Sequence, residues 1–180
     1  MTITDQEQNK VALMYGALWA CLILVCIPSI SFAIVASVLF LILIITAYIV
    51  KRKSEDSNFI HNHMQYIIKT VWFSIFIFPV VTITIATLYM MPNIDNTSIM
   101  PCAQPLADHL LANPDQADMQ TMYGYIAPCM NDFMIGNKQV FLIATIIAGL
   151  PILIYMTYRL MKGTMLTLQS KIHANPKSWL

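Results

Sequence analysis

The sequence predicts an all-α integral membrane protein, with four transmembrane helices and a small helical, disulfide-closed extracytoplasmic loop. Three observations predict this fold class. Hydrophobic residues make up 58% of the 180-residue chain and charged residues only 11%, whereas a soluble globular domain carries about 25% charged residues. The apolar residues gather in long runs that are almost free of charge. The one long polar stretch between two of these runs contains a cysteine pair.

The first apolar run covers 11–50 and contains no Asp, Glu, Lys, Arg or His. As a single helix it would be about 60 Å long, which is roughly twice the hydrocarbon thickness of a bilayer. We therefore expect a transmembrane hairpin with helices over 11–28 and 31–50. Its turn falls on the helix-breaking residues of the run, which are Pro28, Ser29 and Ser31.

A polar segment over 51–63, which begins with consecutive basic residues, ends the hairpin and is interpreted as a loop. The apolar run over 64–91 predicts the third transmembrane helix, in which Pro79 should produce a kink. The run over 138–161 predicts the fourth transmembrane helix. A polar, basic tail over 162–180 follows it.

The segment over 92–137 differs from the rest of the chain, since it holds five prolines, five Asp and no Lys or Arg. It is too long for a turn and too small for an independent domain. We expect two short helices inside it, the first over 105–112. The second should begin at Asn113 and Pro114, a cap residue followed by a proline in the first turn, and end near Tyr123.

Cys102 and Cys129 are the only cysteines of this loop, so each has one possible partner there. A bridge between them would stabilise the loop by about 3–4 kcal/mol in the chain-entropy model, and we expect it to form. A redox-active pair is the alternative, although such pairs usually have Cys-x-x-Cys spacing. Cys21 and Cys26 lie inside the first helix, where we interpret them as small apolar residues.

The basic residues predict the orientation in the membrane, because Lys and Arg collect in cytoplasmic loops. Nine of the ten lie on one side of the predicted topology, and Lys138 alone lies on the other. This bias places the N-terminal segment 1–10, the 51–63 loop and the 162–180 tail in the cytoplasm. The bilayer is thus an expected partner, and the formal net charge of +1 indicates no nucleic-acid partner.

No residue pattern predicts catalysis, cofactor binding or metal binding. His61 and His63 are two residues apart and would point to different faces of a helix, so they do not predict a two-histidine metal site. His109 lacks the further ligands that a zinc site requires. His173 lies in the polar tail, where we expect it to be solvated. We therefore expect a protein that is not an enzyme.

Small residues recur at every fourth position on several predicted helices, and such ridges let helix backbones approach closely in lipid. They pack either within one chain or between the subunits of a homo-oligomer, and the sequence leaves both possibilities open. The residues are Ala12, Gly16 and Ala20; Ser29, Ala33 and Ser37; and Ala144 and Ala148.

Two stretches of the sequence resemble the pattern of a known group of proteins. The first is the basic stop YIVKRK over 48–53 with HMQYIIKTVW over 63–72. The second is a tail pattern composed of Tyr158, Arg159, Lys162, Gly163, Leu166, Leu168, Pro176 and the final Ser178, Trp179 and Leu180. They resemble a family of small uncharacterised bacterial inner-membrane proteins, which have a basic stop, a Ser-His…Gln-Ile-Arg-Thr-x-Trp pattern and a Tyr-Arg…Arg-Gly tail. The matching residues are His63, Ile68, Thr70 and Trp72, whereas Lys69 replaces Arg and Ile67 replaces Gln.

The resemblance covers about half of the chain and implies a bacterial inner membrane, so that the 92–137 loop would be periplasmic. It implies no reaction, and the family has a short connection where this chain has the cysteine-containing loop. The shared residues should gather at the cytoplasmic interface, where they would bind lipid phosphates or brace the third helix against the fourth. We favour interfacial anchoring for the group, which consists of His63, Lys69, Trp72, Arg159 and Lys162.

The absence of a reactive pattern leads to a functional expectation. We expect an oligomeric inner-membrane scaffold or accessory factor in cell-envelope integrity, division or assembly, which acts on a periplasmic or envelope partner through its loop. The alternative is a subunit of an oligomeric transporter or channel for a small solute or lipid. Proline breaks at Pro79 and Pro151 favour this alternative, and a path would be lined by Thr82, Thr84 or Thr87. The lack of other polar lining counts against it.

Overall fold

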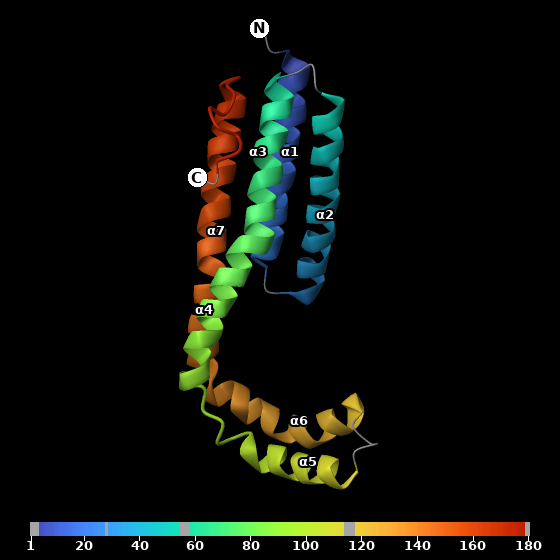
Figure 1. Cartoon of the computed structure of the whole chain (residues 1–180), viewed down its shortest axis with the longest axis vertical. Coiled ribbons are helices and arrows are strands. Elements are labelled where there is room, and N and C mark those ends of the chain that lie inside the picture. Colours follow the sequence, from blue (N-terminus) through green and yellow to red (C-terminus); the bar gives the residue numbers. More distant parts are fainter. Residues whose placement is uncertain (1–3, 28, 55–57, 114–117, 179–180) are drawn as a thin grey trace. The chain divides into compact units, whose positions relative to one another are not determined.

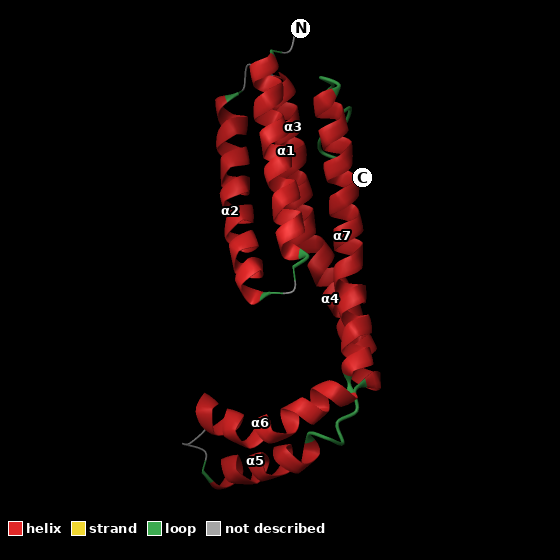
Figure 2. Ribbon diagram, turned by 180° about the vertical axis from the view of Figure 1, so that it is seen from behind, coloured by secondary structure: helices red, strands yellow, loops and turns green. Residues whose placement is uncertain are grey.

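The computed structural model describes residues 4–27, 29–54, 58–113 and 118–178. All regular secondary structure in this part of the chain is helical (Figure 2). Four helices are long and apolar enough to cross a membrane, and they are Asp5–Val25, Ile30–Lys53, Asn58–Asn93 and Lys138–Leu168. The all-α class and the four helices of membrane-spanning length are therefore confirmed.

The elements follow the order α1 (Asp5–Val25), α2 (Ile30–Lys53), α3 (Asn58–Trp72), the π-helical turn η1 (Phe73–Ile77), α4 (Phe78–Asn93), α5 (Met100–Ala112), α6 (Met119–Gly136) and α7 (Lys138–Leu168). They form two compact units. Unit 1 contains Met1–Val81 and Pro151–Leu180, and unit 2 contains Thr82–Leu150.

The helices extend beyond the apolar runs at their polar ends. α1 begins at Asp5, where Thr4 and Glu7 form a capping box that satisfies the first amides of the helix. Most of the predicted 51–63 loop is helical, since α2 ends at Lys53 and α3 begins at Asn58. α7 likewise continues past 161 to Leu168. Hydropathy marks where a helix leaves the lipid, and the helix itself ends where capping and tertiary contacts end it.

Pro79 does not interrupt the third membrane-spanning helix, which continues through it in α4. Proline lacks the amide that would bond the carbonyl four residues earlier, and its ring crowds that carbonyl. The π-helical turn η1 ends at Ile77, two residues before Pro79, and includes the carbonyl that the missing amide would have bonded. The expected disturbance of the helix thus takes the form of a π-helical turn.

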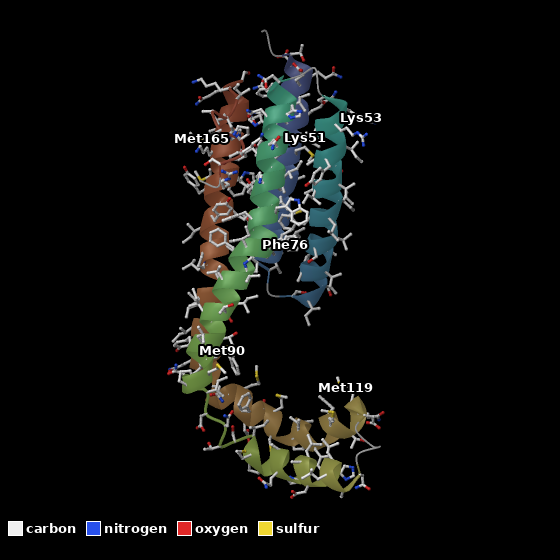
Figure 3. All side chains as sticks on the ribbon, viewed as in Figure 1. Lys51, Lys53, Phe76, Met90, Met119 and Met165 are labelled. Atoms are coloured by element: carbon white, nitrogen blue, oxygen red, sulfur yellow. A yellow bond between two sulfur atoms is a disulfide. The ribbon has the colours of Figure 1, made fainter. Side chains whose placement is uncertain are left out.

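The core of unit 1 forms between α1, α2, α3 and the C-terminal half of α7, which lie side by side in Figure 1. α1 and α3 contribute most of it, through side chains such as Leu18, Met64 and Ile67 that are at most 1% exposed. α2 fully buries only Ala36 and Ala47, and it packs Phe40, Leu43, Ile44 and Val50 partly against the core. Its exposed apolar side chains suit contact with lipid. Lys51 and Lys53 lie at its C-terminal end (Figure 3), where positive charge complements the helix dipole.

Candidate functional site

The 92–137 loop folds as a helical hairpin, formed by α5 and α6 in unit 2. Cys102 of α5 and Cys129 of α6 form a disulfide with Cα atoms 6.1 Å apart, as the sequence predicted. Asn113 is the C-cap of α5, so the expectation that it starts the second helix is wrong. Asp118 caps α6 by accepting a hydrogen bond from the Thr121 amide at 2.6 Å, and Pro114 lies outside the described residues.

The base of the hairpin is closed by Asn137, between α6 and α7. Its side-chain oxygen accepts from the Asp95 amide at 2.7 Å, and its side-chain nitrogen donates to the Asp95 carbonyl at 2.9 Å. Asn137 is only 1% exposed. These paired bonds hold the chain that enters the hairpin against the chain that leaves it, and they were not predicted because a lone Asn carries no sequence signal.

One side of α6 exposes a stripe of large apolar residues, which we call the Met stripe. Met119, Tyr123, Met130 and Met134 are 83%, 70%, 40% and 49% exposed. At about 100° per residue they fall within an arc of about 60°. No residue of α6, all of which the structure describes, is buried. A Met-rich apolar surface is typical of sites that bind a partner.

The opposite side of α6 is acidic, because Asp118 and Asp132 lie roughly half a turn away from the Met stripe. The whole segment over 92–137 carries five Asp and no Lys or Arg. Hydrogen bonds from Thr97 and Thr121 lower the pKa of Asp95 and Asp118, respectively. These carboxylates are therefore charged at neutral pH, and the hairpin combines an apolar stripe with a net negative charge.

A second group of interest lies in unit 1, where α1, α3 and α7 enclose polar side chains that we call the buried polar cluster. Tyr15 connects two histidines: its hydroxyl oxygen lies 3.2 Å from His63 Nδ1 and 3.4 Å from His173 Nε2. His63 Nε2 donates to the Lys171 carbonyl at 3.0 Å. In a neutral His63 ring, Nδ1 then accepts the proton of Tyr15.

The tail after α7 folds back onto this cluster. The Asn62 side chain donates to the His173 carbonyl at 2.9 Å and accepts from the His173 amide at 2.8 Å. His173 is 3% exposed, so the expectation of a solvated histidine is wrong. Burial, followed by the positive charges of neighbouring groups, lowers the pKa of His173 to about 3. His173 is therefore neutral at physiological pH.

Arg159 is the largest fully buried side chain of the described residues, with 0% exposure. Its Nε donates to the Thr70 hydroxyl at 3.0 Å, and its Nη1 donates to the Ser178 carbonyl at 3.2 Å. Its Nη2 has no hydrogen-bond partner. Arg159 is therefore enclosed by the protein and has no exposed surface of its own. Its bond to Thr70 connects α7 to α3, which agrees with the bracing role that was the alternative to anchoring.

Tyr66 provides the aromatic surface for this cation. The Arg159 guanidinium carbon lies 3.6 Å from the ring centroid of Tyr66, and the His173 ring stacks on Tyr66 at a centroid distance of 3.6 Å. Both planar groups cannot occupy one face at that distance, so they lie on opposite faces of the ring. The Tyr66 hydroxyl also donates to the Arg159 carbonyl at 3.2 Å.

The remaining predicted interface residues lie closer to the surface. Trp72 is 43% exposed, and its indole nitrogen donates to the Tyr48 hydroxyl at 3.0 Å. Lys69 and Lys162 are partly exposed, whereas His63 is fully buried within the cluster. The structure thus brings His63 near Arg159 and its neighbours but separates both of them from solvent.

The cluster has a sequence signal that was missed. Asn62, Tyr66 and Thr70 on α3 and Ser74 on η1 recur every fourth residue and are all at most 8% exposed. On α7, Arg159, Gly163 and Thr167 follow the same spacing. Residues four apart lie on one face of a helix. Two polar ridges in otherwise apolar helices predict that those faces meet, since lipid would leave such groups unpaired.

The small-residue ridges differ in where they lie. Gly16 and Ala20 on α1 are exposed, as are Ala33 and Ser37 on α2. A Cβ added at Gly16 would meet no atom within 4 Å. Ala12, Ser29 and Ala148 are partly buried and Ala144 is 5% exposed. Packing within the chain therefore accounts for the ridge on α7 but leaves most of the first two ridges uncovered.

The three threonines of α4 that would line the alternative transport path differ in their exposure. Thr82 is 5% exposed and its hydroxyl has no partner, whereas Thr84 and Thr87 are exposed. Within the described residues, no group of three His, Cys, Asp or Glu side chains is arranged to hold a metal ion.

No family model, no curated protein and no solved structure matches this chain.

Proposed function

We propose that this protein is a non-enzymatic inner-membrane scaffold or accessory factor in cell-envelope integrity, division or assembly. Its α5–α6 hairpin docks a partner protein on the exported side of the membrane. Four membrane-length helices anchor the chain, and the disulfide fixes the two hairpin helices to each other.

The Met stripe is the observation that carries the proposal. Met119 and Tyr123 are among the most exposed large apolar side chains of the described residues. Their exposure costs about 25 cal/mol for each Å² of apolar surface left in water, which a docked partner would recover. Methionine adapts its shape to a partner at small cost, because its side chain is unbranched and polarisable.

A protein partner fits the charge of the hairpin better than a membrane surface does. Helices that lie on membranes usually carry Lys and Arg, which attract anionic lipids. The 92–137 segment has neither residue and holds five Asp. The expected partner therefore presents an apolar groove for the Met stripe with basic residues near it.

The exposed ridge on α1 supports self-association. Gly16 and Ala20 face open space in the single chain, and small residues at this spacing let helices of two subunits approach closely in lipid. A homo-oligomer would present several hairpins together, which raises the avidity of docking.

Photocrosslinking in living cells tests the proposal. A photoreactive amino acid at Tyr123, on the Met stripe, should give a discrete protein adduct. The same group at Asp132, which is exposed on the other side of α6, serves as the matched control and should give none. Equal adducts from both positions, or adducts with lipid alone, would contradict docking through the Met stripe.

A further inference from the structure

A small cavity with both polar and apolar lining lies between α3, α7 and the returning tail of unit 1. Its volume is about 190 Å³, several times what one buried water requires. Lys162 and His173 line it with Asn175 and Ser178, and Tyr66 contributes one wall. The lining thus combines one cation with neutral hydrogen-bonding groups, since His173 is held in its neutral form.

A second cation lies behind the wall of this cavity. Arg159 stacks on Tyr66 and donates to the carbonyl of Ser178, and both of these residues line the cavity. Arg159 makes no ion pair with any described carboxylate. The side-chain carboxylates among the described residues of unit 1 are those of Asp5 and Glu7, in the first turn of α1.

A buried cation that pairs with no carboxylate of the described residues is costly to that extent, because burial removes its hydration. The aromatic face of Tyr66 and the two acceptors described above offset part of this cost. The Nη2 atom of Arg159 still has no acceptor. An anion in the cavity would complete the site, since it would contact Lys162 directly and interact with Arg159 across a low-dielectric wall.

An apolar groove continues from the cavity along α7. It has a volume of about 470 Å³ and shares Lys162 and Leu166 with the cavity. Met161 and Met165 line it and are 52% and 57% exposed, and Met165 points away from the neighbouring helices (Figure 3). A ligand that follows both features has a negative head and an apolar chain.

We propose that this cavity binds the phosphate group of an anionic phospholipid, with an acyl chain in the adjoining groove. The returning tail forms part of the binding site, because His173, Asn175 and Ser178 all belong to it. The lipid thereby links the position of the tail to the composition of the membrane. This site is separate from the hairpin and does not depend on its function.

Native mass spectrometry of the purified full-length protein tests the site. The detergent would contain phosphatidylglycerol or phosphatidylethanolamine at equal concentrations. The wild type should retain phosphatidylglycerol preferentially. Lys162→Gln should weaken its binding about fivefold, the effect expected for loss of one basic residue near a phosphate, and Lys162→Arg should restore it. Lys53→Gln, an equal charge change at an exposed position, should alter binding by less than about twofold.

Three results would overturn the proposal. One is equal retention of the two lipids by the wild type. Another is an equal loss of binding in Lys162→Gln and Lys53→Gln, which would indicate a general charge effect. The third is displacement of phosphatidylglycerol by inorganic phosphate at a similar concentration, which would show that the ligand is a soluble phosphate. Failure of this experiment would leave the docking of the hairpin untouched.

Discussion

Gly163 shows how one residue of the tail motif supports the buried polar cluster. A Cβ built at this position would overlap the ring of Tyr15, whereas a Cβ at Gly16 meets nothing within 4 Å. Tyr15 is 1% exposed and links His63 to His173, so it has little room to move. Gly163 is required here for close approach rather than for backbone freedom.

Gly163→Ala should therefore destabilise the protein by about 1–3 kcal/mol, the usual cost of overpacking a core. Thermal unfolding in detergent measures the change. Gly149→Ala, also on α7, is the matched control. It should be neutral or stabilising by about 0.5–1 kcal/mol, because its added Cβ meets no atom within 4 Å and alanine is the better helix former. A Gly163→Ala protein as stable as the control would show that Tyr15 is not confined as described.

His173 should make the docking of the tail dependent on pH. Its pKa is about 3 when docked and about 6.5 when released. The released tail therefore binds more protons between these values, so docking is fully stable above about pH 6.5 and weakens as the pH falls toward 3. Hydrogen exchange at the His173 amide, relative to an unfolded peptide, should show this loss of protection on acidification.

His173→Phe provides the control for this titration, since phenylalanine stacks on Tyr66 but does not titrate. The protection of its amide at residue 173 should depend much less on pH than that of the wild type. Equal pH dependence in the two proteins would assign the effect to another group.

At the scale of the elements, the sequence predicted the helices better than their ends. Charge-free runs identify the four helices of membrane-spanning length, because lipid excludes charge. The same criterion misjudged 51–63, which is largely helical, because Lys and His are compatible with helix in water. The tail was misjudged for a different reason. Its burial depends on contacts such as Asn62 with His173, which are 111 residues apart and leave no local signal.

The disulfide is the element-scale prediction that the structure confirms, and it leads to a further expectation. Cys102→Ser with Cys129→Ser should lower the stability of the α5–α6 pairing by about 3–4 kcal/mol in the chain-entropy model. Hydrogen exchange should then accelerate in α5 and α6 and stay unchanged in α1 and α3. Cys26→Ser, at an exposed free cysteine, should leave both regions unaffected. Unchanged protection of the hairpin in the double variant would mean that the disulfide does not hold it.

At the scale of the whole molecule, the charge distribution connects the two proposals. Nine of the ten basic residues lie on the side of the predicted topology that contains the C-terminal end of α2 and the tail. The 92–137 segment holds five Asp and no Lys or Arg. The orientation predicted from this bias underlies both proposals, because it places the hairpin outside and the lipid cavity at the cytoplasmic interface. The buried polar cluster was not predicted, since single polar residues in apolar helices were interpreted one at a time rather than as facing ridges.

Labelling with a membrane-impermeant maleimide tests that orientation most directly. Single cysteines would replace Gln120 in α6 and Gln169 after α7, both of which are exposed, in a Cys26→Ser background. With the cell envelope opened but the inner membrane intact, Gln120→Cys should be labelled and Gln169→Cys protected until the membrane is dissolved. Labelling of Gln169→Cys with protection of Gln120→Cys would contradict the orientation and, with it, a hairpin that docks a partner outside the cytoplasm.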